Sequence, residues 1–184
     1  MSQIVIVYHS GYGHTKKVAE AVAAGSGGTL LPIDAEGNLS EADWATLAGA
    51  DAIVFGTPTY MGGPSWQFKK FADASSKPWF GRVWKDKIAA GFTNSASLNG
   101  DKASTLNYLF TLSQQHGMVW VGLGMLPSNS KAATRGDLNN MGASAGLLTT
   151  TPSDASVDEM VAGDLATAHG FGERVAATVA RWVR

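Results

Sequence analysis

The chain has 184 residues, 14 basic and 15 acidic side chains, a formal net charge of −1 and no cysteine. This balance gives no reason to expect a nucleic acid or an anionic membrane as partner, and the lack of cysteine excludes disulfides, a thiol nucleophile and cysteine metal ligands. The length predicts one domain over residues 1–184, and because neither an apolar membrane span nor a signal peptide is apparent, we expect a cytoplasmic protein.

The first elements follow from apolar periodicity. A β-branched run at residues 4–8 predicts a buried strand, and a helical pattern at 15–24 ends at the glycines that follow it. Residues 29–34 predict a second strand, which Pro32 places at a sheet edge. A short helix is expected after Ser40, whose hydroxyl suits an N-cap.

The rest of the chain continues this alternation. Strands are predicted at 51–56, 87–92 and 118–123, and helices at 65–74, 103–115 and 157–182. Five strands alternating with five helices predict an α/β fold, a doubly wound parallel sheet with helices on both faces. In such sheets a ligand binds beyond the carboxyl ends of the strands.

Three polar segments follow strands one, three and four. They read "HSGYGHT" (9–15), "TPTYMGG" (57–63) and "TNSASLNG" (93–100). Each would be an ordinary loop alone, but the topology brings all three to one edge of the sheet. They predict a ligand site there.

The first of these segments has the chemistry of a phosphate loop. Hydroxyls of Ser10 and Thr15 stand beside glycines at a helix start, where free backbone N–H groups and the helix dipole favour an anion. It is not a Walker A loop, and Lys16 stands where the third glycine of GxGxxG belongs. Asp34, about twenty residues on, stands where a ribose-binding acid would be expected, so a Rossmann dinucleotide site remains an alternative. The structural alternative is a plain strand–helix turn in which Ser10 and Thr15 only cap the helix.

A family resemblance rests on three motifs in this order. "YHSGYGHT", "FGTPTYMGG" and "QQHGMVWVG", together with the tail "MGASAGLLTTTPSDASVDEMVAGDLATAHGFGERVA", resemble the flavodoxin-like NAD(P)H:quinone oxidoreductases of the WrbA type over nearly the whole chain. The resemblance implies a flavodoxin-like fold with strand order 2-1-3-4-5, FMN at the switch point, and a homotetramer.

The resemblance also implies three FMN-binding segments. They are Ser10, Gly11, Tyr12, Gly13, His14 and Thr15 for the phosphate; Thr57, Pro58, Thr59, Tyr60, Met61, Gly62 and Gly63 around the ring; and Thr93, Asn94, Ser95, Ala96, Ser97 and Leu98 on its other side.

Substrate and catalytic roles are implied as well. By resemblance His116 contacts the flavin near its reactive face, Tyr12 borders the nicotinamide site and Trp79 walls the substrate pocket. A histidine suits quinone reduction, which needs a hydride and a proton. Plain alternatives remain: His116 at a helix end can simply cap carbonyls, and Trp79 can be an interface or core residue. The histidines form no metal pattern with acidic neighbours, so we expect no metal site.

The chain departs from the family at two places. Tyr60 and Met61 replace the usual Arg and Phe, and "ASLNGDKAS" (96–104) replaces a glycine-rich loop. A cation beside the reduced flavin is thereby lost. Residues 124–155 are too long for an ordinary loop, and a lid, an oligomer contact or a split fifth strand would each account for them.

Two functions of different classes follow. The first is an FMN-dependent enzyme that passes two electrons from NADH or NADPH to quinone-like acceptors by a ping-pong mechanism. The alternative is a flavodoxin-like FMN-binding electron carrier acting on protein partners, and a weaker third is a protein binding another nucleotide. Carrier flavodoxins are strongly acidic, so the near-zero charge favours the enzyme.

Overall fold

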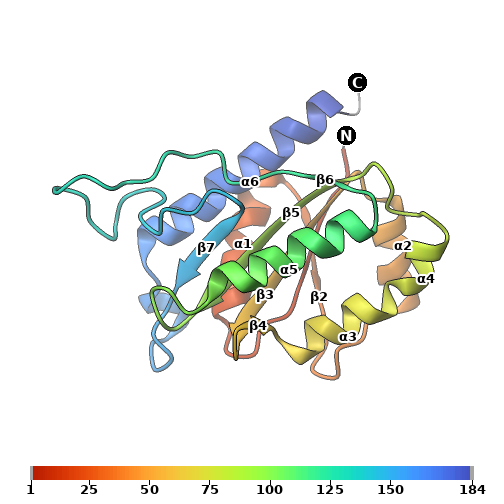
Figure 1. Cartoon of the computed structure of the whole chain (residues 1–184), viewed down its shortest axis with the longest axis horizontal. Helices are drawn as coiled ribbons and strands as arrows, with labels where there is room; N and C mark the ends of the chain where they lie inside the picture. Colours follow the sequence, from red (N-terminus) through yellow and green to blue (C-terminus); the bar gives the residue numbers. More distant parts are fainter. Residues whose placement is uncertain (1, 183–184) are drawn as a thin grey trace.

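The computed structural model describes residues 2–182, and one parallel sheet organises them (Figure 1). The strands are β1 (Ile4–Tyr8), β2 (Thr29–Pro32), β3 (Ala52–Tyr60), β5 (Ile88–Ser95) and β6 (Val119–Trp120), in the order β2-β1-β3-β5-β6. Two short strands join them: β4 (Gly63–Pro64), antiparallel to β3, and β7 (Leu147–Thr150), parallel to β5. The predicted fold class and strand order are confirmed, and β2 with Pro32 lies at the edge.

Helices cover both faces of this sheet. On one face lie α1 (His14–Ser26) and α6 (Ala162–Trp182); on the other lie α2 (Glu41–Gly49), α3 (Trp66–Ala74) and α5 (Lys102–Gln115). The five buried residues of β1 alternate between the two apolar cores, with Val5 and Val7 facing one and Ile4, Ile6 and Tyr8 the other. A strand buried on both faces reads as a continuous apolar run, as predicted.

Several element boundaries differ from the sequence prediction. The short α4 (Ser76–Phe80) was not predicted, and the last helix is interrupted: η1 (Val157–Glu159) precedes an extended Met160, and α6 begins only at Ala162. Ser40 is confirmed as an N-cap, since its hydroxyl accepts the Asp43 N–H and the Asp43 carboxylate accepts the Ser40 N–H.

The fifth strand is split, one of the three structures considered for residues 124–155. The predicted strand at 118–123 is wrong beyond β6, which pairs only with the beginning of β5; β7 pairs with its end, from Phe92 opposite Leu147 to Ser95 opposite Thr150. Between these halves residues 121–146 form an insert without helix or strand, and its middle projects to one side in Figure 1. Asn139 holds this insert together through side-chain bonds to Met125 O (3.0 Å) and to both Ala143 O (3.0 Å) and Ala143 N (2.9 Å).

Helices α1 and α6 pack backbone to backbone. A Cβ on Gly172 would lie 2.2 Å from the carbonyl oxygen of Val22, and one on Gly25 would lie 2.0 Å from that of His169. Neither distance is possible for a real side chain, so the two helices approach this closely only because both positions are glycine. The seam fixes α1, whose first turn belongs to the site described next.

Candidate functional site at the carboxyl edge of the sheet

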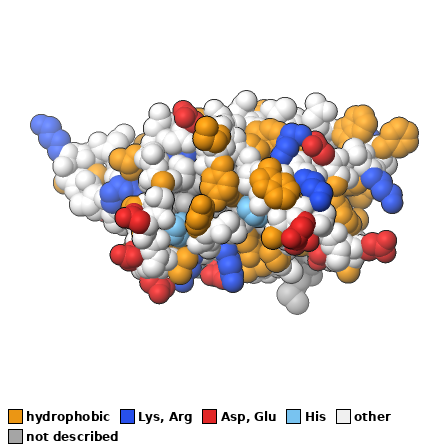
Figure 2. Space-filling model, turned by 90° about the horizontal axis from the view of Figure 1, so that it is seen from below, with side chains coloured by type: hydrophobic (Ala, Val, Ile, Leu, Met, Phe, Trp, Pro, Cys, Tyr) orange, Lys and Arg blue, Asp and Glu red, His pale blue; other side chains and the backbone are white. Residues whose placement is uncertain are grey.

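A pocket of about 130 Å³ opens at the carboxyl ends of the strands. It is lined by all three predicted segments and by one further stretch: Tyr12, His14, Thr15, Pro58, Thr59, Tyr60, Asn94, Ser95, Ala96, Thr151 and Ser153. This edge is the lower one in Figure 1, and Figure 2 shows it from below, with hydrophobic and histidine side chains near its middle. The structure therefore brings the three segments together, as the topology predicts.

The first segment wraps the start of α1. The Ser10 hydroxyl oxygen accepts the N–H groups of Gly13 and Lys16, each at 3.1 Å, which leaves the hydroxyl hydrogen available to a ligand. Gly13 has a φ of 90°, and α1 begins at His14 without a side-chain cap. The Ser10 hydroxyl already takes the Lys16 N–H, so it is the N–H groups of His14 and Thr15, which have no partner within the helix, that suit an anion.

Only part of the second segment lines the pocket. Thr57 is fully buried and its oxygen accepts the Ser65 N–H (3.1 Å), so it fixes the start of α3 rather than facing a ligand. Thr59 lies 2.8 Å from both Thr93 Oγ1 and Thr105 Oγ1. Tyr60 ends β3 at the rim, where its ring meets the exposed Tyr12 edge to face at 6.2 Å.

Met61 and Gly62 form the two-residue turn between β3 and β4. Their φ angles are 48° and 77°, the left-handed pair that such hairpin turns require. Met61 is fully exposed, and a Cβ on Gly62 or Gly63 would meet nothing within 4 Å. The three residues stand beside the pocket's rim with open space around them.

The third segment is also divided. Asn94 and Ser95, which are the last residues of β5, line the pocket together with Ala96. Asn94 is fixed by hydroxyls of β7 and the residue after it: its Oδ1 accepts Thr149 (2.9 Å) and Thr151 (3.1 Å). Thr93 is buried behind them, while Ser97 and Leu98 are exposed and lie outside the lining.

A fourth segment, which the sequence prediction missed, completes the pocket. Thr151 and Ser153 follow β7, and the imidazole Nε2 of His14 donates to Ala155 O at 2.8 Å. The signal was present, because "TTTPSD" places hydroxyls after an apolar strand as the other three segments do. It was missed because the split strand hid β7.

His116 and Trp79 lie apart from this pocket within one chain. A helix that follows a parallel strand runs back across the sheet, and the 14 residues of α5 span roughly 20 Å, so its C-cap His116 lies at the other end. There Trp79 Nε1 donates to Gln115 O (2.8 Å), and both residues border a shallow separate depression. Their predicted roles at a flavin ring stay predictions.

His116 is deeply buried there. Ser75 donates its hydroxyl hydrogen to Ala72 O (2.6 Å), so the 2.9 Å contact to His116 is donated by Nε2. Its Nδ1 has no partner among the described residues, and its ring lies 4.2 Å from that of Trp84. Burial lowers the pKa of His116 to about 4.

The pocket lining suits a flat, anionic ligand. None of its residues is a carboxylate, and its donors are backbone N–H groups and hydroxyls, with two tyrosines at the rim. Ligand pockets usually measure about 300–1,000 Å³, so this one encloses only part of such a molecule and leaves the rest on the open aromatic rim. Within residues 2–182 no cluster of three or more His, Asp or Glu is placed to hold a metal ion.

Comparison with known proteins agrees with this arrangement. "Flavodoxin FldP" of Pseudomonas aeruginosa is 55% identical over 176 residues, which cover 96% of each protein. The chain belongs to the flavodoxin-like protein family. Residues 42–132 also match the family model described as "NADPH-dependent FMN reductase".

Two further relatives extend the range of this flavodoxin-like family. A crystal structure described as a "flavodoxin, WrbA-like protein" from Agrobacterium tumefaciens has a TM-score of 0.82 and 55% identity, covering 98% of this chain and 99% of that one. An "NAD(P)H dehydrogenase (quinone)" of Geotalea uraniireducens is 32% identical over 99% of this chain and 100% of its own length. No helix within residues 2–182 of this flavodoxin-like chain is both long and apolar enough to cross a membrane.

Proposed function

We propose that the chain binds FMN at the carboxyl edge of its sheet and exchanges electrons with a redox partner, as a flavodoxin-type carrier does. The observation that carries this proposal is the pocket at the start of α1: N–H groups without a partner inside the helix, the Thr15 hydroxyl in the lining, the Ser10 hydroxyl in the preceding loop, and no carboxylate in the lining. The donors fit the FMN phosphate, and the rim tyrosines fit the flat isoalloxazine ring. FMN, when bound, supplies the redox chemistry, and the protein supplies its placement.

The carrier is favoured over the two-electron enzyme by two observations. The relative with 55% identity bears the name flavodoxin, whereas the relative named for quinone reduction is 32% identical. Within one chain the pocket also lacks the histidine assigned to proton transfer, because His116 is buried at the far end of α5. His14 lines the pocket, but its Nε2 is committed to Ala155 O.

NAD(P)H-dependent quinone reduction is the second candidate. It is supported by the family description and by the exposed aromatic rim, where Tyr12 would border a nicotinamide and Tyr60 a flat acceptor. Both cosubstrates would use the same face in turn and give ping-pong kinetics. A cytoplasmic location would supply NADH or NADPH as donor.

The quinone reductase needs a second copy of the chain if His116 and Trp79 serve it. Trp79 is 44% exposed and Phe80, next to it, is 85% exposed, as interface residues are. We therefore retain the homotetramer as part of this second candidate. Sedimentation velocity over a wide dilution series, run with and without FMN, should show one oligomer; a monomer that reduces quinones at every concentration would remove His116 and Trp79 from the site.

One set of experiments separates the two candidates. Calorimetric titration with FMN and with riboflavin tests the site, and equal affinity for the two would overturn the phosphate loop. Anaerobic titration with dithionite then resolves the number of reduction steps. A carrier should show two separate one-electron steps and negligible NAD(P)H oxidation with benzoquinone, whereas a single two-electron step with rapid turnover would establish the enzyme.

A further inference from the structure

A lysine lies fully buried directly behind the wall of the pocket. Lys102 is the first residue of α5, and none of its side chain is exposed to solvent. Its ammonium group donates to Ser97 O (2.6 Å), Ser95 Oγ (2.8 Å) and Thr150 Oγ1 (2.9 Å), so all three of its hydrogens are used. Ser95 also lines the pocket, so the cation lies one residue behind the lining.

The position of Lys102 is unfavourable for the fold alone. A cation in the first turn of a helix opposes the positive end of the helix dipole, and burying a charge costs several kcal/mol in proteins generally. No carboxylate lies within ion-pair distance of its ammonium group among the described residues. Burial accordingly lowers the pKa of Lys102 from 10.5 to about 8.

The loop around Lys102 is built tightly over it. Gly100 has a φ of 53°, and a Cβ there would lie 2.1 Å from Ser95 Oγ. The preceding helix cap, Asp101, is likewise left-handed at φ 52°. The chain therefore has one strained and one glycine-dependent position in the loop that folds over the Lys102 ammonium group. Ser95, which this ammonium group contacts, belongs to the pocket lining.

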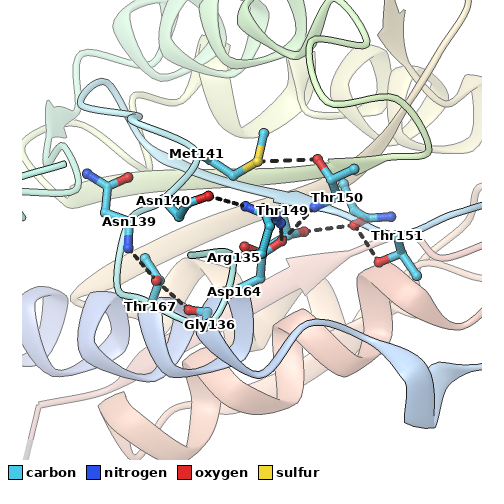
Figure 3. A network of polar contacts seen from close by, with 12 residues as sticks. Arg135, Gly136, Asn139, Asn140, Met141, Thr149, Thr150, Thr151, Asp164 and Thr167 are labelled. Atoms are coloured by element: carbon cyan, nitrogen blue, oxygen red, sulfur yellow. Dashed lines mark hydrogen bonds and ion pairs between the residues drawn. The ribbon is translucent and has the colours of Figure 1, made fainter. Parts of the chain in front are cut away.

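One buried carboxylate balances the cation at a distance. Asp164 Oδ2 accepts Thr150 N–H (2.8 Å) and the Arg135 guanidinium (2.7 Å), and Figure 3 shows these three residues converging. Arg135 belongs to the insert and Asp164 to the first turn of α6, so the network runs from the insert through β7 to Lys102. Asp164 attracts the Lys102 charge, while Arg135 repels it.

We propose that Lys102 is a positioning residue of the flavin site: it fixes the Ser95 wall and places a positive charge behind it that favours reduced, anionic FMN over oxidised FMN. The inference rests on the FMN binding proposed above. Lys102 acts through Ser95 and does not touch the ligand. A charge held in a poorly solvated interior acts over several ångströms with little screening. We expect the Lys102 charge to change the ratio of the affinities for reduced and oxidised FMN by about tenfold.

The test is the ratio of the affinities for reduced and oxidised FMN, obtained from the midpoint potential of bound relative to free FMN. Lys102→Met removes the charge with similar side-chain length and should lower the ratio about tenfold. Asp164→Asn removes the balancing anion and should raise it, while still accepting Thr150 N–H. Lys69→Met, at an exposed lysine on α3 paired with Asp73, is the matched control and should leave the ratio unchanged.

Opposite signs for the two buried variants separate an electrostatic role from a structural one, since loosening of the wall would shift both ratios in one direction. Thermal unfolding establishes that each variant is folded; should Lys102→Met not fold, Lys102→Gln, which also removes the charge, takes its place. Tight FMN binding by the wild-type chain with an unchanged ratio in Asp164→Asn and in the folded Lys102 variant would overturn this inference and leave the proposed function standing. Failure of the wild-type chain to bind FMN would overturn both.

Discussion

The two ends of α5 each bury a basic side chain, and the surroundings of the two differ. At the first residue, Lys102 has three oxygen partners and lies behind the pocket wall. At the C-cap, the His116 ring has the Ser75 hydroxyl as its one partner among residues 2–182, its Nδ1 has none there, and the Trp84 ring packs against it. The helix dipole would favour a cation at the C-terminal end and disfavour one at the N-terminal end, so the chain has its stronger base where the dipole opposes it.

The contrast is the basis for our proposal that the N-terminal end of α5 serves the ligand. At the C-terminal end burial and packing determine the protonation of His116, which is neutral at pH 7 because its pKa is about 4. At the N-terminal end hydrogen bonds satisfy a cation at a cost to the fold, next to a pocket without carboxylates. Four experiments test this division between the pocket end and the packing end.

The largest expected effect is at the pocket end. Replacing Ser10 and Thr15 together by Ala removes two hydroxyls and the acceptor that holds the N–H groups of Gly13 and Lys16. At about 1.5–3 kcal/mol for each hydrogen bond to a charged group, FMN affinity should fall at least tenfold. Isothermal titration with FMN and riboflavin measures this, and riboflavin affinity should change much less. A parallel loss for both ligands would place the phosphate elsewhere.

The second effect belongs to the packing end. The unfolded chain protonates His116 near pH 6.5 and the folded chain only near 4, so stability should fall as the pH drops from 6.5 to 4, by up to about 2–3 kcal/mol. His116→Gln should flatten this part of the profile in urea unfolding and leave FMN affinity unchanged. His169→Gln, at an exposed histidine of α6, is the control. Loss of FMN affinity in the monomeric His116→Gln variant would return the histidine to the site.

The third effect concerns Lys102, and it is expected at alkaline pH, whereas that of His116 is expected at acidic pH. Because the folded chain releases this proton near pH 8 and the unfolded chain near 10.5, stability should rise with pH between those values, by about 1–3 kcal/mol. Asp164 and Arg135 are the charged groups that act on it, the first raising and the second lowering the pKa of Lys102. Lys102→Met should remove the rise. Identical pH profiles for the two proteins above pH 8 would show that the lysine is not buried as a cation.

The smallest effect concerns the strained rim. Met61 has a φ of 48°, and its fully exposed side chain makes no contacts that offset the cost of this left-handed backbone. Met61→Gly should therefore stabilise the chain by about 0.5 kcal/mol. Leu126 is almost as exposed but has no positive φ, and Leu126→Gly should be neutral or destabilising. Urea unfolding of both variants gives the comparison. Destabilisation by Met61→Gly would mean that the methionine makes a contact that its exposure hides.

The sequence predicted what depends on local patterns and topology. Ser10 and Thr15 were recognised because small and hydroxyl residues between an apolar strand and a helix have few other uses, and strand alternation brought the three polar segments to one edge. Thr151 and Ser153 were missed because pairing of β7 with β5 is a contact over some fifty residues, which no local pattern specifies. Lys102 lay in a stretch, "NGDKAS", that is typical of a solvated loop.

His116 shows a different limit. Its assignment came from resemblance, while the direction of α5 places it at the opposite end of the helix from the pocket in the same chain. Likewise, Thr57 and Thr93 stand in the expected segments, but both are fully buried, and their hydroxyls bond to Ser65 and Thr59 respectively. Residue type and position along the chain locate a site to within a segment, and side-chain direction decides which members reach it.

The glycine seam between α1 and α6 has a consequence for genetics. Gly172 lies in α6, away from the pocket, yet any side chain there must push α6 away from α1, whose first turn carries the proposed phosphate-binding groups. In an unbiased screen for variants that lose flavin colour, Gly25 and Gly172 should therefore be recovered alongside Ser10 and Thr15. Alleles at the seam would be mistaken for active-site alleles, and second-site suppressors in the opposing helix should be rare, because the clash is with backbone atoms that no smaller side chain removes.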